Sequence, residues 1–423
     1  MRALIIAAPA SGSGKTVITL GLIRALRNRG LKVASAKLGP DYIDGRFHDA
    51  ASGQPCINLD FWAMGQDACA GRLVELGSGQ DIVIIEGVMG LFDGPDGARG
   101  STADFAEAFG LPIILVVDTA RQAQSIAATI HGFTSYRPSV TVAGVILNHV
   151  ASDRHETMLR NALGETKILA VLRHNDSYAW PSRHLGLVQA MENQQLDTFI
   201  ETAAAGVSRE TILDMVFESA VSFESSLQSG QKSLPPLAQN IAIARDEAFN
   251  FIYPHIIDDW RNAGARLSFF SPLNDEIPNG DAIFLPGGYP ELHAAKIASS
   301  TKFLDSLRQF TGLIYGECGG YMIMGDGIID KNGVCHAMAG LLPLTTSFAN
   351  RKLHLGYRQL GPLCGPFKLP LRGHEFHYST IEHQGHADPL FRARDAAGNE
   401  LGNIGQRIGS IMGSYAHIIG QAH

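Results

Sequence analysis

Short apolar runs alternate with helix-like stretches through the first half of the chain. In the first helix-like stretch, Val17, Leu20 and Ile23 recur at the spacing of one helix face. The helix-like stretches are residues 17–29, 122–131 and 154–163, and the apolar runs are residues 3–8, 32–38, 81–86, 113–117, 140–147 and 168–172. This alternation of strand and helix predicts an α/β fold with a doubly wound parallel sheet.

A change in composition near the middle of the chain indicates a boundary between two domains. Residues 222–240 are rich in Ser, Gln, Gly and Pro, and a new strand pattern opens at residues 241–244. A chain of 423 residues is also longer than one core usually covers. We therefore expect a first domain at 1–221, a linker at 222–240 and a second α/β domain at 241–423.

Charge and composition argue against several classes of protein. The net charge of −7 without a basic run argues against a nucleic-acid partner, and no apolar segment approaches the ~20 residues of a membrane helix. The five cysteines are an odd number without a C-x-x-C pair, which fits neither a disulfide framework nor a zinc site. The apolar run 3–8 leads straight into a glycine-rich loop, so we do not interpret it as a signal peptide. We expect a cytoplasmic protein without nucleic-acid or membrane partners.

Residues 8–16, Ala-Pro-Ala-Ser-Gly-Ser-Gly-Lys-Thr, connect the first strand to the first helix as a phosphate-binding loop would. The glycines let backbone N–H groups turn toward phosphate oxygens, Lys15 would place a charge on the β and γ phosphates, and Thr16 would offer a hydroxyl to Mg²⁺. The residues expected to bind ATP are Gly12, Ser13, Gly14, Lys15 and Thr16. The strict pattern G-x-x-x-x-G-K-[ST] fails at Pro9, so a glycine-rich turn before an ordinary helix is the alternative.

Carboxylates follow two of the apolar runs. Asp41 and Asp44 stand just after the second run, and Glu86 ends the third. Parallel α/β sheets bind ligands at the carboxyl ends of their strands, where acidic groups can hold Mg²⁺. Glu86 is our candidate metal ligand, because Asp93 and Asp96 bring further carboxylates into the loop behind it. For Asp41 and Asp44, an Asp-rich turn is an equally good interpretation.

The stretch Leu-Ile-Tyr-Gly-Glu-Cys-Gly-Gly-Tyr-Met contains a second chemical motif. It predicts a strand that ends at Tyr315, a sharp turn permitted by Gly316, Cys318 at the apex and a helix directly after it. Such an elbow presents a nucleophile, and the helix N-terminus favours the thiolate. Backbone N–H groups of Gly288 and Gly319 would then serve as oxyanion donors. A buried structural cysteine is the alternative.

Residues 372–379, Arg-Gly-His-Glu-Phe-His-Tyr-Ser, contain two histidines and a glutamate. Alternation along a strand would place His374 on one face and Glu375 with His377 on the other. Because the two histidines would be split between the faces, we do not expect a metal site here.

Several motifs together resemble one family of biosynthetic enzymes. They are residues 8–16, 37–44, 85–94 and 100–104. In combination they are similar to the cobyrinic or hydrogenobyrinic acid a,c-diamide synthases of cobalamin biosynthesis, and the resemblance covers essentially the whole chain. It implies a first domain like dethiobiotin synthetase, followed by a class I glutamine amidotransferase domain. It also implies ATP as a substrate and Mg²⁺ as a cofactor.

The resemblance also assigns roles within the first domain. By it, Asn148, which follows the apolar run 140–147, would help to hold the adenine. We place Thr16, Asp44 and Glu86 at the metal, and Asp41, Tyr42 and Asp93 at the substrate. How the four carboxylates divide these two roles stays open at this point.

Near the end of the chain, Gly-Ser-Tyr-Ala-His-Ile matches the place where class I glutamine amidotransferases carry their histidine, which here is His417. Most of that class have a glutamate two residues later, where this chain has Ile419. The cobalamin-pathway amidotransferases characteristically lack it, so the departure supports the narrower family. It also predicts a weaker glutaminase, because an imidazole without an orienting carboxylate spends less time in the productive tautomer. By the same resemblance, residues 372–379 border the glutamine pocket, with a purely structural strand as the alternative.

These features together predict ATP- and glutamine-dependent amidation of the a and c carboxylates of hydrogenobyrinic or cobyrinic acid. Cys318 would attack glutamine, His417 would protonate the departing ammonia, and an internal passage would carry ammonia to a carboxylate phosphorylated by ATP. Residues 55–60 favour the cobalt-free ring. The alternatives are cobyric acid synthase-like amidation of other corrinoid carboxylates and a partitioning-type switch ATPase, whose usual extra lysine is Ser11 here. The partners would be the corrinoid, glutamine and ATP, with a homodimer as one expectation.

Overall fold

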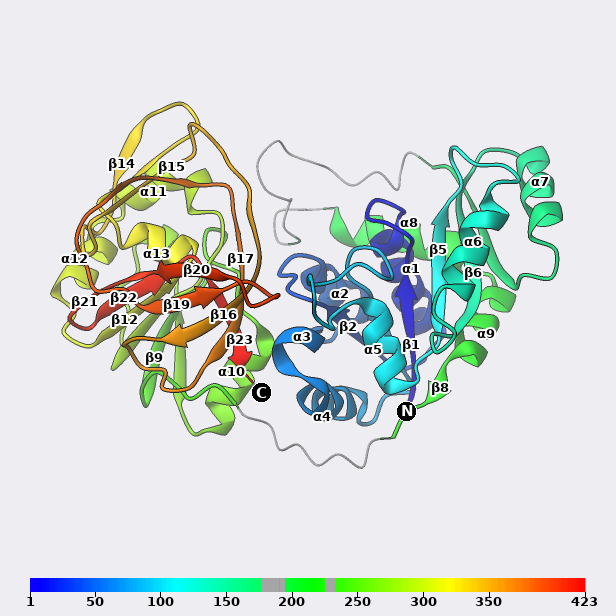
Figure 1. Cartoon of the computed structure of the whole chain (residues 1–423), viewed down its shortest axis with the longest axis horizontal. Coiled ribbons are helices and arrows are strands. Elements are labelled where there is room, and N and C mark those ends of the chain that lie inside the picture. The colour runs from blue at the N-terminus through cyan, green and yellow to red at the C-terminus, as the bar shows by residue number, and fades with distance from the viewer. Residues whose placement is uncertain (176–189, 191–194, 225–232, 423) are drawn as a thin grey trace. The chain divides into compact units, whose positions relative to one another are not determined.

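The computed structural model describes residues 1–175, 190, 195–224 and 233–422 (Figure 1). The chain divides into two compact units, one of Met1–Gly94 with Arg99–Gln231 and the other of Pro95–Ala98 with Lys232–His423. Residues 225–232 of the expected linker lie outside the described part of the chain. None of the helices in the described ranges is long and apolar enough to cross a membrane.

The first unit is built around a sheet whose parallel strands follow the order β3-β2-β4-β1-β5-β6-β7. These strands are β1 (Arg2–Ala7), β2 (Val33–Leu38), β3 (Ile57–Leu59), β4 (Ile82–Glu86), β5 (Ile113–Asp118), β6 (Val142–Val150) and β7 (Ile168–Arg173). A short strand, β8 (Val221–Ser222), pairs antiparallel with β1. All six apolar runs became strands of this sheet, which confirms the predicted parallel α/β fold. The edge strand β3 was not predicted.

Helices connect the strands of the first unit. They are α1 (Lys15–Asn28), α2 (Asp44–Ser52), α3 (Phe61–Met64), α4 (Gln66–Gly77), α5 (Thr102–Phe109), α6 (Ile126–Ser135), α7 (Asp153–Leu163), α8 (Leu196–Val207) and α9 (Glu210–Ser219). The central helix α1 packs against α8 and α2. Strand residues such as Ile5, Ile84 and Leu115 are fully buried, which explains why the strands read as continuous apolar runs rather than alternating ones.

The second unit contains a mainly parallel sheet with the order β10-β9-β11-β12-β22-β21, in which only the β21–β22 pair is antiparallel among the described strands. Its strands are β9 (Asn240–Ala244), β10 (Arg266–Phe270), β11 (Ala282–Leu285), β12 (Leu313–Glu317), β21 (Gln406–Ile408) and β22 (Ile411–Ser414). The α-helices of this unit are α10 (Pro254–Asn262), α11 (Ala294–Ser299), α12 (Thr301–Gln309) and α13 (Gly319–Ile323). Helix α13 begins directly after β12, as the elbow motif predicted.

Two smaller sheets complete the second unit. One has the order β14-β13-β15-β18 and the other, fully antiparallel, the order β20-β19-β16-β17-β23. The strands are β13 (Gly327–Ile329), β14 (Cys335–Ala337), β15 (Leu344–Ser347), β16 (His354–Pro362), β17 (Leu371–His377), β18 (Thr380–Gln384), β19 (Phe391–Arg394), β20 (Glu400–Ile404) and β23 (His417–Gln421). The second sheet matters for function because β17 carries the histidine motif and β23 begins at His417.

Candidate active sites

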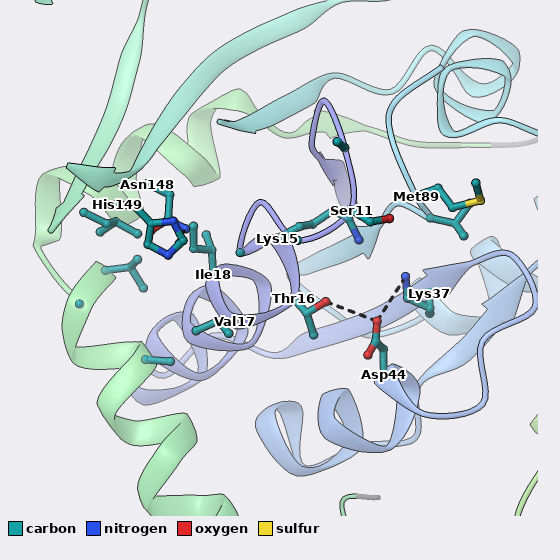
Figure 2. A pocket seen from close by; sticks show the side chains of 18 of the residues that line it. Ser11, Lys15, Thr16, Val17, Ile18, Lys37, Asp44, Met89, Asn148 and His149 are labelled. Atoms are coloured by element: carbon teal, nitrogen blue, oxygen red, sulfur yellow. Dashed lines mark hydrogen bonds and ion pairs between the residues drawn. The ribbon is translucent and has the colours of Figure 1, made fainter. Parts of the chain in front are cut away.

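The loop between β1 and α1 forms one wall of a pocket of about 530 Å³ (Figure 2). Gly12 and Gly14 have φ values of 82° and 86°, which only glycine adopts without strain. Ser13 Oγ donates to the carbonyl oxygen of Ala10 at 2.8 Å and so closes the turn. At Gly14, a Cβ would collide with the side-chain amide of Asn148. The loop thus has the left-handed glycines and the following helix that a phosphate site requires.

Glu86 lies at the centre of the charged residues beside this loop and is fully buried. Its Oε1 accepts hydrogen bonds from Lys15 Nζ at 2.8 Å and from Thr16 Oγ1 at 2.7 Å. Its Oε2 lies 2.7 Å from Nε2 of His48. Burial alone would raise the pKa of Glu86, but Lys15, Lys37 and His48 hold it well below its usual range. Glu86 is therefore a carboxylate whose two oxygens are both held in place.

His48 is equally buried, on α2. Burial alone would lower its pKa, but Cys56 and Glu86 raise it to about 9, so the ring is a cation near neutral pH and Nε2 donates to Glu86. His48 thus binds the carboxylate oxygen of Glu86 that Lys15 and Thr16 do not contact.

A second lysine, Lys37 at the end of β2, joins the acidic residues of the site. Its Nζ donates to the carbonyl oxygen of Gly87 at 3.0 Å and lies 3.5 Å from Asp44 Oδ2, 3.6 Å from Asp41 Oδ2 and 3.6 Å from Glu86 Oε1. Burial alone would lower the pKa of Lys37, but Glu86 and the two aspartates raise it. The predicted carboxylates 41, 44 and 86 thus meet around one buried ammonium group.

The two aspartates differ in how they are held. Burial and Asp41 raise the pKa of Asp44 to about 8, and Thr16 Oγ1 donates to its Oδ2 at 3.3 Å. Asp41 Oδ1 accepts from the backbone N–H groups of residues 43 and 44, which together with Lys37 lower its pKa although burial would raise it. Figure 2 shows Asp44 between Thr16 and Lys37 at the edge of the pocket.

Three other predicted residues have different surroundings. Asn148 lines the pocket and donates from Nδ2 to the carbonyl oxygen of Ser13 at 3.0 Å, so it holds the phosphate loop. Asp93 is exposed, and its carboxylate accepts from the backbone N–H of Gly90 at 3.0 Å. Tyr42 is half-buried next to Asp41. Of the residues predicted for the substrate, Asp41 lines the pocket whereas Tyr42 and Asp93 are not among its described lining residues.

In the second unit, Cys318 occupies the turn between β12 and α13 with a φ of 46°. Its backbone N–H donates to Ser414 at 2.8 Å, and its Sγ lies 3.9 Å from the carbonyl oxygen of Phe376 on β17. A positive φ at a non-glycine residue is the strained conformation typical of a nucleophile elbow. Burial and Glu291 raise the pKa of the thiol, whereas the Gly319 backbone N–H opposes this. The neutral thiol therefore predominates in the folded protein.

Two details of the elbow differ from the prediction: the neutral thiol is favoured over the thiolate, and the strand before the turn ends later than expected. Strand β12 does not end at Tyr315 but continues through Gly316 to Glu317, and the turn is made by Cys318 alone. Gly316 is needed for close packing instead, because a Cβ there would lie 2.9 Å from the backbone of Gly320 in α13. The glycine thus allows the helix to approach the strand.

The predicted oxyanion residues and His417 cluster around the same turn. A Cβ on Gly319 would lie 3.2 Å from the backbone nitrogen of Gly288, so the two glycines are adjacent. A Cβ on Gly287 would collide with the imidazole of His417. Burial lowers the pKa of His417 to about 3, with His374 and His377 adding to the effect. The ring is consequently a neutral base.

Strand β17 carries Glu375 and His377 on one face, as predicted, but β16 adds His354 beside them. Candidate ligand atoms of these three residues lie within 4.8 Å of one another. The rings of His354 and His377 are stacked, with centroids 4.7 Å apart and an interplanar angle of 9°. Arg358 also binds Glu375, with Nε at 2.6 Å from Oε2. The cluster is an ion-pair and stacking arrangement that reasoning along one strand could not reveal.

Sequence reasoning missed Lys37, His48 and Glu317. Lys37 interrupts an otherwise small and apolar buried strand, and His48 stands four residues after Asp44 on the same helix face, so both left a sequence signal. Glu317 directly precedes Cys318, but the direction of its side chain could not be predicted, because it depends on where β12 ends.

Comparison with known proteins assigns a domain family to each half of the chain. Residues 4–188 match the CobQ/CobB/MinD/ParA nucleotide binding domain, and residues 240–423 match the CobB/CobQ-like glutamine amidotransferase domain. Hydrogenobyrinate a,c-diamide synthases from three organisms resemble the whole chain. The one from Brucella anthropi is 50% identical over 99% of this chain and 98% of its own length, and that from Rhizobium meliloti is 48% identical over 99% of each. The one from Rhodobacter capsulatus is 47% identical over 99% of this chain and 98% of its own.

These matches confirm the predicted family, the nucleotide-binding fold and the amidotransferase domain. They do not favour a partitioning-type switch ATPase, because a glutamine amidotransferase domain has no part in such a switch. With about half of all positions identical over nearly its full length, this chain belongs to the hydrogenobyrinate a,c-diamide synthase family.

Proposed function

We propose that this protein uses ATP and glutamine to convert the a and c carboxylates of hydrogenobyrinate into amides. The observation that carries the proposal is the presence, in one chain, of a phosphate loop with clustered carboxylates and of a cysteine elbow next to a buried neutral histidine. The relatives named above supply the identity of the ring and of the carboxylates.

At the phosphate loop, backbone N–H groups and Lys15 would bind the phosphates of ATP, and Asn148 would help to hold the adenine. Lys37, which lies beside Asp44 and Glu86, would neutralise charge on the γ phosphate and on the incoming carboxylate. A substrate carboxylate would attack the γ phosphate, because a free carboxylate is too poor an electrophile for ammonia. The acyl phosphate then accepts ammonia, and phosphate leaves.

Mg²⁺ fits the donor set of this site. Thr16 Oγ1, Asp44 Oδ2 and Glu86 Oε1 are hard oxygen ligands, and the threonine hydroxyl is within hydrogen-bond distance of both carboxylate oxygens. We propose that these three residues hold the ion, and that Asp41, Tyr42 and Asp93 contact the substrate. When bound, Mg²⁺ would supply charge stabilisation for the phosphates. His48 would keep Glu86 oriented through Oε2 while Oε1 changes partners.

At the elbow, His417 would accept the thiol proton as Cys318 attacks the side-chain amide of glutamine. The N–H groups of Gly288 and Gly319 would stabilise the oxyanion, and the proton would pass from His417 to ammonia as the C–N bond breaks. Water then hydrolyses the γ-glutamyl thioester to glutamate and restores the thiol. The low pKa of His417 keeps the ring unprotonated before the thiol proton is transferred.

The test is to incubate the protein with ATP, glutamine and either the cobalt-free or the cobalt-containing ring, and to identify products by mass spectrometry. We expect the diamide of the cobalt-free ring, with glutamate and ADP formed alongside. Amidation of other carboxylates would instead indicate a cobyric acid synthase-like activity, and ATP hydrolysis without glutamate release would contradict the proposal.

The remaining expectations concern organisation. We propose a synthetase domain at 1–221, a linker at 222–240 and an amidotransferase domain at 241–423, which limited proteolysis would test. A homodimer and a cytoplasmic location stay predictions, to be checked by light scattering and cell fractionation.

A further inference from the structure

A buried carboxyl group lies beside His417, although the position two residues after that histidine is Ile419. It belongs to Glu317, the last residue of β12, whose exposed fraction is only 4%. Its Oε2 lies 3.9 Å from Nδ1 of His417, and its Oε1 accepts a hydrogen bond from the backbone N–H of Ile418 at 3.2 Å. The same side chain therefore contacts the backbone of β23 next to His417 and faces its ring.

We propose that Glu317 positions His417 for glutamine hydrolysis. It would do so in place of the glutamate that most class I glutamine amidotransferases carry two residues after the histidine. A carboxyl group that holds Nδ1–H fixes the tautomer and leaves Nε2 to accept the thiol proton. This inference rests on the proposed role of His417 as the base at Cys318.

The path of β12 explains why residue 317 can take this place. The strand continues beyond Gly316, and Glu317 pairs with Ser414 of β22, three residues before His417. Because Cys318 then turns sharply away into α13, Glu317 and Cys318 come from adjacent positions but reach different parts of the site. A separation of 3.9 Å is longer than a hydrogen bond, and such contacts in ligand-free sites tighten when the substrate binds.

The other carboxylate near His417 is already engaged. Glu375 receives a hydrogen bond from Arg358 Nε at 2.6 Å on Oε2, and His377 Nε2 lies 2.9 Å from Oε1. These two partners lower the pKa of Glu375 to about 2 although burial would raise it. With both oxygens occupied, Glu375 is less suited to orient His417 than Glu317 is.

The proposal has a consequence for pH dependence. Burial raises the pKa of Glu317 to about 8, while the Ile418 N–H and Tyr315 act in the opposite direction. Below that pH the carboxyl is protonated, so it accepts from Nδ1–H only weakly and carries no charge to stabilise the imidazolium, and glutaminase activity should rise as the pH approaches and passes 8. The other titratable groups that face this pair are Tyr315, Cys318, His374, Glu375 and His377.

The experiment compares the full-length protein with its Glu317→Gln, Glu317→Asp and Cys318→Ala variants. Glu382→Gln, an exposed position on β18, is the matched control. Glutamate release is measured against glutamine concentration and against pH, and ammonium-dependent amidation is measured on the same samples. We expect Glu317→Gln to lower kcat for glutamate release by about tenfold or more, with an unchanged KM and without the ascending pH limb. Glu317→Asp should recover part of kcat, and ammonium-dependent amidation should be retained.

Each other outcome has a distinct meaning. Wild-type kcat and an intact pH limb in Glu317→Gln would overturn the positioning role, provided that Cys318→Ala has lost glutamate release. Glutamate release that survives in Cys318→Ala would overturn the proposed glutaminase site itself. If Glu317→Gln fails to fold, the wild-type pH profile decides, since the absence of an ascending limb contradicts the proposal.

Discussion

Apart from Asp44, whose pKa is raised to about 8, the two sites bury their main ionisable groups in opposite ways. Beside the phosphate loop, Lys37, His48 and Glu86 keep their charged forms, because each buried charge faces an opposite one within 4 Å. At the elbow, burial moves the groups toward their neutral forms, raising the pKa of Cys318 and lowering that of His417 to about 3. Phosphoryl transfer needs fixed charges before the substrate arrives, whereas a thiol needs to ionise only once glutamine is in place.

This difference predicts how each site responds to mutation. Removing one partner from a buried ion cluster leaves an uncompensated charge, which costs about 3–5 kcal/mol in comparable proteins. Removing a buried neutral group leaves no such charge. Substitutions at the phosphate loop should therefore affect ligand binding and stability together, while substitutions at the elbow should affect chemistry with little change in stability.

Lys15→Ala should have the largest effect. It removes the cation that would contact the phosphates and one of the partners of Glu86, so amidation should fall by about a thousandfold or more with either glutamine or ammonium. Glutamate release should continue, because the elbow belongs to the other unit. Both reactions are measured on one preparation, and ammonium-dependent amidation that survives would refute the role of the loop.

Cys318→Ala should abolish the reactions that use glutamine and spare the reaction that uses ammonium. Without the only proposed nucleophile, glutamate release and glutamine-dependent amidation should vanish. Amidation with a high concentration of ammonium salt, at a pH that supplies free ammonia, should survive, and the thermal unfolding temperature should barely change. His417→Ala should behave similarly with little residual glutaminase, because burial raises the pKa of the Cys318 thiol and leaves little thiolate without a base. Loss of ammonium-dependent amidation in a folded Cys318→Ala protein would show that the sites are not separable.

Glu86→Gln should have an intermediate effect. The amide cannot serve as an anionic ligand, so we expect the Mg²⁺ concentration for half-maximal activity to rise by about tenfold. Calorimetric titration of ATP with and without Mg²⁺ gives a readout apart from turnover, and Glu107→Gln on the exposed side of α5 is the control. An unchanged Mg²⁺ dependence would move the metal role to Asp44.

The fold of the first unit was predictable because local patterns agree with the tertiary structure. The central strands β1, β2, β4 and β5 are buried on both faces, so they appear in the sequence as apolar runs, and each functional loop follows such a run. The edge strand β3 was missed because three residues carry too little pattern. The phosphate loop was predictable for a related reason, since its glycines act through local backbone conformation.

The site residues that sequence reasoning missed depend on contacts between distant segments. His48 and Glu86 are separated by 38 residues, and their contact follows from the packing of α2 against α1 and β2, the strand that pairs with β4. Glu317 and His417 meet because β12, β22 and β23 converge, and the expected end of β12 at Tyr315 concealed the direction of Glu317. His354 reaches Glu375 only through the pairing of β16 with β17. Sequence patterns specify elements and turns, while these pairings are properties of the assembled sheets.

The smallest expected effect concerns Glu375. It is an ionised, paired group close to the neutral Cys318 and His417, so it tests whether pairing stabilises a buried charge in the second unit as well. Arg358 and His377 bind both of its oxygens and lower its pKa to about 2. A carboxyl group with a lowered pKa contributes stability that is present above its unfolded pKa of 4.5 and is lost as the pH falls toward 2. Glu375→Gln should therefore lower the free energy of unfolding of the second unit by about 1–3 kcal/mol at neutral pH, and the difference from wild type should shrink below pH 4.5.

Urea unfolding at a series of pH values measures this difference. Glu400→Gln is the matched control, because Glu400 pairs with Arg394 on the same five-stranded sheet but is exposed. Solvent screens that pair, so its loss should leave stability unchanged at every pH. If Glu375→Gln and Glu400→Gln behave alike, burial does not strengthen the Glu375 cluster. The contrast between paired buried charges and buried neutral groups would then hold for the two sites only. It would not extend to the five-stranded sheet that carries Glu375 and His417.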